Sequence, residues 1–246
     1  YDHGGDSNKG YAIVGSVDSS DNSIAFGTHV KYENSSVNNA EATFDSNSNK
    51  IVIAYSDQAD GDDGKAIVGT VSGTSISFGS STKFETGGVF GNWMGAAFDS
   101  TNNKVVIAYA DTNNSAYGTG IVGTVSGTSI SFGTPTVFES AQVNYVRVAF
   151  NEAVGKVIIA YKDMGNSNRG TYVEGTVSGT SISFNTPATF PNTADANYTS
   201  VSYDSDQYAV IISFSNLDNS SYGTAFSYQS TASITNLTSE NYIGMS

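Results

Sequence analysis

Short apolar stretches alternate with turn-forming residues along the chain, and four kinds of stretch recur in a fixed order. The first, such as Ala40–Asp45, alternates apolar and polar residues. The second, such as Ile51–Tyr55, is continuously apolar, which is typical of a strand buried on both faces. The third and fourth, such as Ala66–Val71 and Ser75–Phe78, lie on either side of a tight turn and carry small or polar residues that suit one exposed face. The pattern predicts units of four short antiparallel strands.

This unit recurs nearly five times. The sequence Gly-Thr-Val-Ser-Gly-Thr-Ser-Ile-Ser-Phe occurs identically at Gly69–Phe78, Gly123–Phe132 and Gly175–Phe184. Gly15–Phe26 is a diverged copy with two extra residues in its turn, and a copy whose sequence has diverged further, called the worn copy below, begins near Ser227. An aromatic residue ends each second strand, and a glycine follows nine residues later in every copy: Tyr1 and Gly10, Tyr55 and Gly64, Tyr109 and Gly118, Tyr161 and Gly170, Phe214 and Gly223. The chain is therefore a tandem repeat with a period of about 53 residues.

Four-stranded units that repeat in tandem predict an all-β fold, and the β-propeller is the architecture that best protects their edge strands. The repeat count favours five blades in one domain spanning residues 1–246. The expected units are approximately 1–40 (partial), 41–94, 95–146, 147–198 and 199–246. A β-solenoid is the second choice, because solenoid coils are generally much shorter than this unit.

The two ends of the chain leave the closure of the ring open. There are four pairs of first and second strands but five pairs of third and fourth strands, because Tyr1 stands at the end of a second strand. We interpret this start as a processed or excised end. Either five blades form the ring, or Thr199–Ser215 joins Tyr11–Tyr32 in a composite blade. The second arrangement closes four blades and leaves residues 216–246 as a tail.

Composition narrows the choice of partners. The chain has 10 Lys and Arg against 23 Asp and Glu, which gives a net charge of −13. Phosphate backbones and anionic lipid surfaces attract basic proteins, so nucleic acid and membranes are not expected partners. No apolar run approaches the roughly 18 residues of a membrane span, so membrane insertion is not expected. The chain has no cysteine, which excludes disulfides and thiolate chemistry.

Polar and aromatic residues recur in the connections that one rim of such a fold collects. Two residues after the aromatic residue that ends the second strand, these loops carry Asp57, Asp111 and Asp163, and five residues after it they carry Asn114, Asn166 and Asn219. The connections before the first strands add Trp93, Tyr145 and Tyr198 at equivalent positions. Aromatic rings beside carboxylates and amides suit stacking on a sugar and hydrogen bonding to its hydroxyl groups. We take these nine residues as the candidate ligand-binding set.

Two other interpretations of these loops remain open. Asp and Asn favour turns because their side chains bond to nearby backbone N–H groups, so the alternative role of the aspartates is only to cap their loops. The acidic loop Asp57–Gly64 also suggests calcium, but it lacks the glutamate that closes an EF-hand loop. No metal ion and no cofactor are therefore expected.

The acidic residues do not suggest catalysis. Most of them repeat with the unit, as do Glu33, Glu85 and Glu139, whereas catalysis requires one asymmetric constellation. The only two histidines are His3 and His29, so a Ser-His-Asp arrangement is not expected. The sequence favours a protein that is not an enzyme.

One further sequence pattern indicates where the protein is located. The succession of Lys104–Tyr109, Asn114–Gly118, Ile121–Gly133 and Val137–Ser140 resembles a repeat common in tail-fibre-like and secreted proteins of marine phages and bacteria. The ending Thr235–Gly244 resembles the segment that leaves the repeats for the next module in such proteins. The resemblance covers essentially the whole chain. It implies an attachment protein located extracellularly or on a virion surface, and it brings no catalytic residues.

These observations together predict a non-catalytic binding module. Similar weak sites arrayed on one rim would bind a repetitive surface with high avidity. The expected partner is a glycan or another cell-surface receptor, and a homo-oligomer is compatible with this role. The alternative is a structural module that docks other proteins, and a polysaccharide-degrading enzyme is the least favoured hypothesis.

Overall fold

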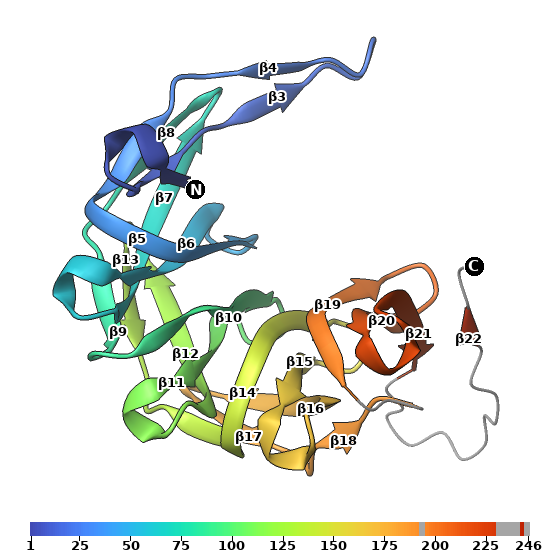
Figure 1. Cartoon of the computed structure of the whole chain (residues 1–246). Coiled ribbons are helices and arrows are strands. Elements are labelled where there is room, and N and C mark those ends of the chain that lie inside the picture. Colours follow the sequence, from blue (N-terminus) through green and yellow to red (C-terminus); the bar gives the residue numbers. More distant parts are fainter. Residues whose placement is uncertain (192–194, 230–241, 244–246) are drawn as a thin grey trace.

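The chain is an all-β molecule in a computed structural model, as the sequence predicts, and its strands form a curled array (Figure 1). The structure describes residues 1–191, 195–229 and 242–243. The worn copy that begins near Ser227 and the closing segment Thr235–Gly244 lie mostly outside these residues. Short 3-10 helices are the only helical elements in the described ranges.

Five units follow one another along the array. The first unit contains β1 (Asp2–His3), β2 (Lys9–Ala12), β3 (Gly15–Val17), β4 (Ile24–Phe26) and the beginning of β5 (Val30–Asp45). The second contains the rest of β5, β6 (Lys50–Asp57), β7 (Asp63–Ser72), β8 (Ser75–Phe78) and β9 (Thr82–Glu85). The third contains β10 (Val89–Asp99), β11 (Lys104–Asp111), β12 (Tyr117–Ser126), β13 (Ser129–Phe132) and the beginning of β14 (Thr136–Asn151). The fourth contains the rest of β14, β15 (Lys156–Asp163), β16 (Arg169–Ser178), β17 (Ser181–Phe184) and β18 (Ala188–Thr189), and the fifth contains β19 (Ala196–Asp204), β20 (Ala209–Asn216), β21 (Tyr222–Tyr228) and β22 (Tyr242–Ile243).

The second strand of each internal unit lies in the core, as its continuous apolar run predicts. In β11, Val105, Ile107 and Tyr109 pack against the second unit, whereas Val106 and Ala108 pack against the fourth. All five side chains are fully buried. Each unit therefore has one face toward the preceding unit and one face toward the following unit. Burial of apolar surface between the units supplies most of the stabilisation.

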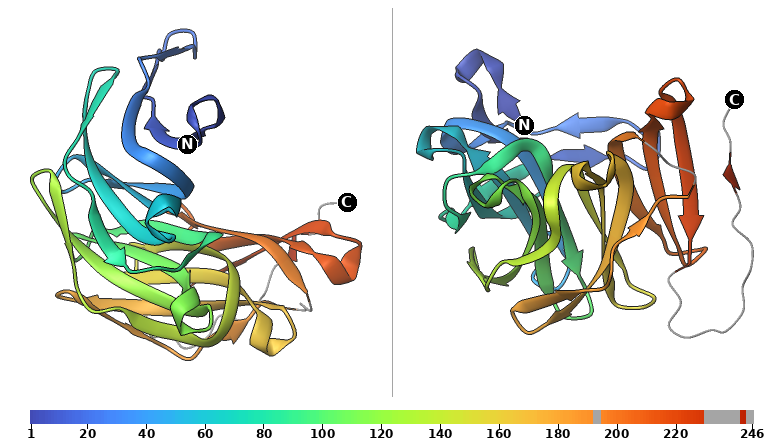
Figure 2. Two further views of the ribbon diagram at one scale, coloured as in Figure 1. Left: turned by 60° about the vertical axis from the view of Figure 1, so that its left-hand side comes forward. Right: turned by 60° about the horizontal axis from the view of Figure 1, so that its bottom comes forward.

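The first strands lie on the inner side of the curve. β5, β10, β14 and β19 follow one another there, and neighbouring members of this series pack closely (Figures 1 and 2). A Cβ atom added to Gly95 would lie 2.8 Å from the backbone nitrogen of Val148, which shows how closely β10 approaches β14. In the second to fifth units the sheet runs from this inner strand through the second and third strands to an outer edge.

The sequence pattern missed one strand segment per unit. The connection from the fourth strand to the next unit was expected to be a loop, but part of it pairs with the third strand of its own unit. Thus β9 pairs with Gly64–Ala66 of β7, and Thr136–Glu139 of β14 pairs with the equivalent part of β12. The outer edge of a unit is therefore built from two consecutive short segments.

The segment that pairs here, β9 and its equivalents, is called the outer segment below. It explains the glycine that stands nine residues after the aromatic residue ending each second strand, which we call the marker aromatic. A Cβ atom on Gly118 would lie 2.3 Å from Cε2 of Phe138, because the phenyl ring packs flat over the glycine. The same overlap occurs in three other units, at Gly10 under Tyr32, Gly64 under Phe84 and Gly170 under Phe190.

The marker tyrosines also have a defined partner. The hydroxyl of Tyr109 donates a hydrogen bond of 2.8 Å to Glu85, which lies on the outer segment of the preceding unit. Tyr55 and Tyr161 bond in the same way to Glu33 and Glu139, at 2.9 and 3.0 Å. In the fifth unit the marker is Phe214, and Pro191 replaces the glutamate, so both partners are lost together.

The described residues form an open arc rather than a closed ring. The composite blade does not form, because β20 pairs with β21 of its own unit, and β2 pairs with β1 and β5. The residues after Asn216 therefore continue the fifth unit through β21 rather than beginning a tail. Figure 1 shows the first and fifth units at opposite ends of the arc. Closure with five blades remains a prediction.

Candidate functional site

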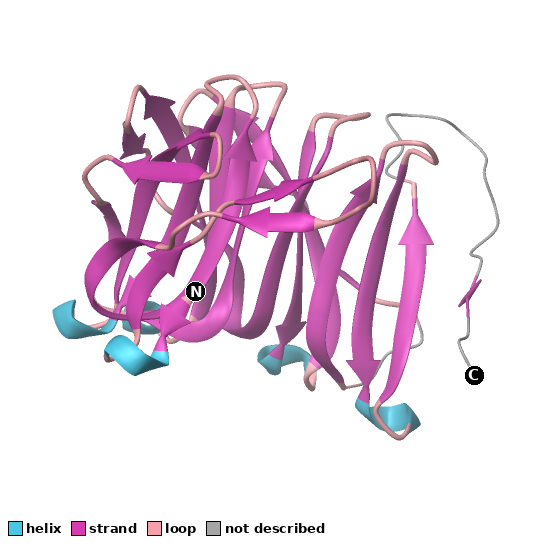
Figure 3. Cartoon of the chain, turned by 90° about the horizontal axis from the view of Figure 1, so that it is seen from above, coloured by secondary structure: helices cyan, strands magenta, loops and turns pink. Residues whose placement is uncertain are grey.

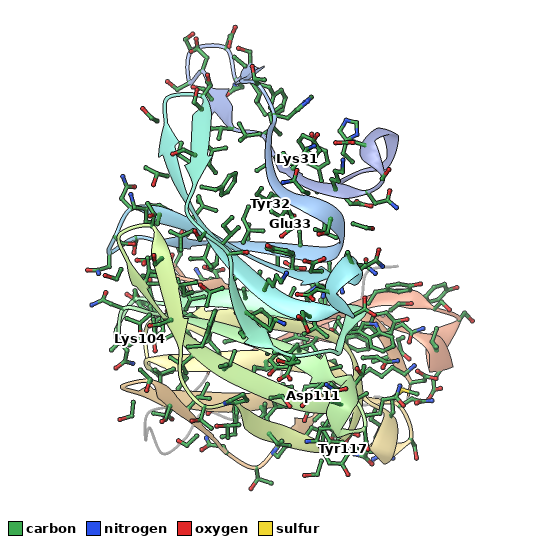
Figure 4. The ribbon with its side chains drawn as sticks, turned by 90° about the vertical axis from the view of Figure 1, so that its left-hand side faces the viewer. Lys31, Tyr32, Glu33, Lys104, Asp111 and Tyr117 are labelled. Carbon is green, nitrogen blue, oxygen red and sulfur yellow. The ribbon has the colours of Figure 1, made fainter. Side chains whose placement is uncertain are left out.

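The two rims of the array differ in construction. Figure 3 shows 3-10 helices along one rim and tight turns along the other, and we call these the helical rim and the turn rim. The helices are η1 (Gly4–Asp6), η2 (Gln58–Asp60), η3 (Thr112–Asn114), η4 (Met164–Asn166) and η5 (Leu217–Asn219). Strands cross from one rim to the other, so that in Figure 4 Lys104 begins β11 at the turn rim and Asp111 ends it at the helical rim. All the candidate ligand-binding residues lie on the helical rim or just inside it.

The repeated aspartates cap the 3-10 helices. Asp111 accepts hydrogen bonds from the backbone N–H groups of Asn113 and Asn114, at 3.0 and 3.2 Å. Asp57 and Asp163 do the same for η2 and η4, and both side chains are nearly fully buried. Burial raises the pKa of Asp163. These carboxylates are thus already engaged, as the turn-capping alternative expects.

The three candidate asparagines point outward from the same helices. Asn114, Asn166 and Asn219 are the last residues of η3, η4 and η5, and all three are exposed on the helical rim. Their backbones complete the helical turns. Their amide side chains are available to a ligand that lies along this rim.

The acidic loop of the second unit is neutralised by lysine. The ammonium group of Lys65 lies 2.6 Å from Asp57 and 3.2 Å from Asp60, and Lys83 forms ion pairs with Asp60 and Asp63. The two ammonium groups occupy the space between the carboxylates, where calcium would be expected. In the described part of the chain, no cluster of three or more metal-ligating side chains occurs.

The three aromatic residues of the inner strands form one continuous row. The rings of Trp93 and Tyr145 are 6.2 Å apart and nearly perpendicular, and those of Tyr145 and Tyr198 are 4.9 Å apart. Each ring comes from a different unit, on β10, β14 and β19 respectively. Tyr198 is 71% exposed, whereas Trp93 and Tyr145 are partly buried. The sequence placed these residues at equivalent positions, and the structure brings them into contact.

A β-bulge directs each ring of this row. The pairing of β14 with β15 shifts register between Asn144 and Arg147, and β19 shifts in the same way against β20. Tyr145 and Tyr198 lie within these bulges with φ angles of 54° and 52°. Bulky side chains rarely adopt this left-handed conformation, which costs about 1–2 kcal/mol per residue. Bulges next to binding sites commonly redirect a side chain in this way.

Charged groups border the aromatic row near its Trp93 end. Arg147 lies two residues after Tyr145, and its guanidinium group is 4.0 Å from Glu41 of β5. The same group donates hydrogen bonds to the backbone carbonyls of Met94 and Val146, at 3.2 and 2.8 Å. Burial raises the pKa of Glu41, and the nearby Arg147 opposes this shift. The pair provides both a donor and an acceptor beside the rings.

A second polar group borders the row near Tyr198. The ammonium group of Lys162 donates to Asp195 and, at 2.7 Å, to the side-chain oxygen of Asn197. Burial, reinforced by the neighbouring Tyr198 and then by Asp195, raises the pKa of Tyr145. Tyr145 therefore remains a neutral phenol, which can both donate and accept a hydrogen bond.

The sequence missed several members of this surface. In the second unit Asn39 stands at the position equivalent to the three aromatic residues, and it shares the left-handed backbone of Tyr145 and Tyr198, with a φ angle of 49°. Aligning the repeats would have identified it. Arg147, Lys162 and Asp195 occur once each and leave no periodic signal, so only the folded structure brings them to the row.

Comparisons with known proteins do not add to this description. No protein-family model matches the chain, and no curated protein resembles its sequence. None of the helices in the described ranges is long and apolar enough to cross a membrane.

Proposed function

We propose that this protein is a non-catalytic binding module that recognises carbohydrate on a cell surface through the row of Trp93, Tyr145 and Tyr198. The observation that carries the proposal is the bulge-directed aromatic row. Three units place an aromatic ring at the same inner position, and two of them do so on an unfavourable backbone. Strain that recurs at one place commonly accompanies function.

The chemistry of the row suits a sugar chain. Aromatic faces pack against the C–H groups of a pyranose ring, and the amide, guanidinium and carboxylate groups on either side can bond to its hydroxyls. A row that spans three units suits an extended oligosaccharide better than a single sugar. Because the net charge is −13, we expect neutral glycans to bind better than sulfated or carboxylated ones.

The use of the repeated carboxylates supports a non-catalytic role. Glu33, Glu85 and Glu139 each accept the hydroxyl of a buried tyrosine, and the repeated aspartates cap helices or turns. These groups perform the same structural task in every copy. A glycosidase would instead require two carboxylates set apart from such tasks at a defined separation.

The finer architecture forms part of the proposal. Units whose innermost strands face a common side, with loops collected on one rim, are what propeller-type blades provide. The exposed asparagines of the helical rim add further contacts one unit apart, which supports multivalent binding. The likeness to tail-fibre and secreted repeats supports an extracellular or virion-surface location.

A glycan array followed by titration calorimetry tests the proposal. Trp93→Ala, Tyr145→Ala and Tyr198→Ala should each weaken binding of the best ligand by about 2 kcal/mol, roughly thirtyfold in Kd. Tyr208→Ala is the matched control, since Tyr208 is 64% exposed with a φ angle of 52° but lies at the turn rim. Absence of glycan binding by the parent protein, or equal losses with the control, would reject the role.

A structural or protein-docking module is the second candidate. The observation that favours it is the apolar outer surface of the first unit, where Val17 and Phe26 are each 65% exposed. This surface lies at the end of the arc, away from the aromatic row, so the two roles can be tested separately.

A further inference from the structure

The two ends of the arc differ in the chemistry of their exposed faces. We call the face of the first unit that points away from the second the N-terminal face, formed by Ile13, Val17, Ile24 and Phe26. The C-terminal face is the outward face of the fifth unit, formed by Ile211, Ser213, Ser215 and Ser227. We assign these residues to the two faces from their positions in the repeat. In the internal units, the residues at the same positions lie between neighbouring units.

The N-terminal face is made of residues that are buried in every internal copy. Ile24 is 55% exposed, whereas its equivalents Ile76, Ile130 and Ile182 are 7%, 3% and 4% exposed. Ile13 is 42% exposed, and its equivalents Ile67, Ile121 and Val173 are 3%, 1% and 0% exposed. In internal units these positions pack on the preceding unit. The first unit thus retains the apolar residues of an interface without the neighbour that would cover them.

The edge of the first unit is also unpaired. In the second unit, Ile51 and Ile53 of β6 pair with Gly69 and Ile67 of β7. In the first unit the equivalent edge is the side of β2 and β3 that faces away from β5 and β4. There β1 pairs only with Lys9 and Gly10, and no described strand pairs with this edge beyond Tyr11. An unpaired edge next to exposed apolar side chains favours the addition of a strand.

The C-terminal face has the opposite character. Val106, Ala108, Ala110 and Val122 cover the following face of the third unit, and the fifth unit has Ile211, Ser213, Ser215 and Ser227 at these positions. The junction before the fifth unit has changed as well. Gly27, Gly79 and Gly133 each lie against a threonine carbonyl of the next unit, whereas Asn185 takes their place in the fourth. Repeat arrays end in units with such a polar outer face.

From this asymmetry we infer that the N-terminal face is a docking surface for one further repeat of the chain's own kind, joined ahead of Tyr1. Its second strand would pair antiparallel with Ile13–Val17, and its third strand and outer segment would cover Ile24 and Phe26, as β7 and β9 cover Ile130 and Phe132. The contacts would reproduce the three interfaces that the internal units make with the units before them. A further repeat would dock at the N-terminal face and not at the C-terminal face, since the polar C-terminal face offers no comparable apolar surface.

A fusion protein tests the inference. A copy of residues 55–108 placed directly before Tyr1 supplies these strands in register, because Tyr109 and Tyr1 are equivalent. Amide hydrogen exchange at Ile13, Gly15 and Val17 should slow by about tenfold or more relative to the parent chain. The matched control is the same fusion with Val68→Asp in the added copy, which places a charge against the N-terminal face and should remove the protection.

A second measurement is independent of the exchange rates. Ile24→Ser should barely change the melting temperature of the parent chain but should lower that of the fusion about as much as Ile130→Ser lowers it in the parent. The inference fails if the fusion gives no protection or if Val68→Asp leaves the protection intact. It also fails if the parent chain already protects Ile13–Val17. Protection in a monomer would mean that its own fifth unit covers the face, and protection in a dimer detected by sedimentation would mean that a second copy does.

Discussion

The glycine under each outer aromatic ring gives the sharpest test of the packing. Gly118→Ala introduces a methyl group 2.3 Å from Cε2 of Phe138, where ordinary contact begins at 3.4 Å, so the ring must move by about 1 Å. It has little room to do so. Phe138 is only 6% exposed, and its ring packs against Tyr161 and Phe184 at centroid distances of 5.1 and 5.5 Å.

The expected cost is that of overpacking a core, about 1–3 kcal/mol. For a chain of this size each kcal/mol lowers the melting temperature by roughly 2–4 °C, so Gly118→Ala should lower it by about 2–12 °C. Gly223→Ala is the matched control, because a Cβ atom there meets no described atom within 4 Å. It should leave stability unchanged or raise it by up to ~1 kcal/mol.

Differential scanning calorimetry of both variants decides the question. The double variant Gly118→Ala, Phe138→Leu should recover part of the loss, because the smaller side chain relieves the overlap. If Gly118→Ala melts no lower than Gly223→Ala, the nine-residue interval between marker aromatic and glycine requires another explanation.

Three further predictions concern the hydrogen bonds, the bulges and the carboxyl groups. Tyr109→Phe should lower the free energy of unfolding by about 1.5–3 kcal/mol in chemical denaturation, because Glu85 loses the hydroxyl that it accepts; an unchanged value would show that the bond contributes nothing. Tyr198→Gly and Tyr208→Gly should each raise stability by up to about 1–2 kcal/mol by relieving a left-handed backbone, but only Tyr198→Gly should weaken glycan binding; equal binding by the two would count against the aromatic row. Glu139 has a pKa raised above its ordinary value of 4.5, first by burial and then by Asp163, so the folded state binds its proton more tightly than the unfolded state. This contribution to stability is present below pH 4.5 and is lost as the pH rises through the raised pKa, and thermal melts of Glu139→Gln should lack this part of the pH dependence.

The strand pattern could be predicted from the sequence because local rules determine it. Alternation and continuous apolar runs identified the inner and buried strands, and Ser75–Phe78 was placed with the bounds that β8 has. β9 escaped prediction because Thr-Lys-Phe-Glu is too short to show a period and lies among turn residues. Its pairing with β7 depends on the fold of the whole unit.

The candidate site could be predicted only in part. Trp93, Tyr145 and Tyr198 could be predicted because they stand at the same position of the repeat. Contact between their rings depends on the spacing of the units and on β-bulges, which the sequence pattern does not predict. Asp111 shows the converse. Its position suited either a ligand or a cap, and only the hydrogen bonds to Asn113 and Asn114 show that it serves as a cap.

Two strands extend beyond the boundary of a single unit, and this has a mechanical consequence. β5 joins the first unit to the second and β14 joins the third to the fourth without a break in the strand, whereas Gly87 and Gly88 separate β9 from β10 with φ angles of 59° and 137°. Under a force applied to its ends, the array should therefore yield at a break such as this glycine pair before it yields within β5 or β14. The first two units would then come apart from the rest as one block, and the five similar repeats would respond to tension as fewer and larger elements.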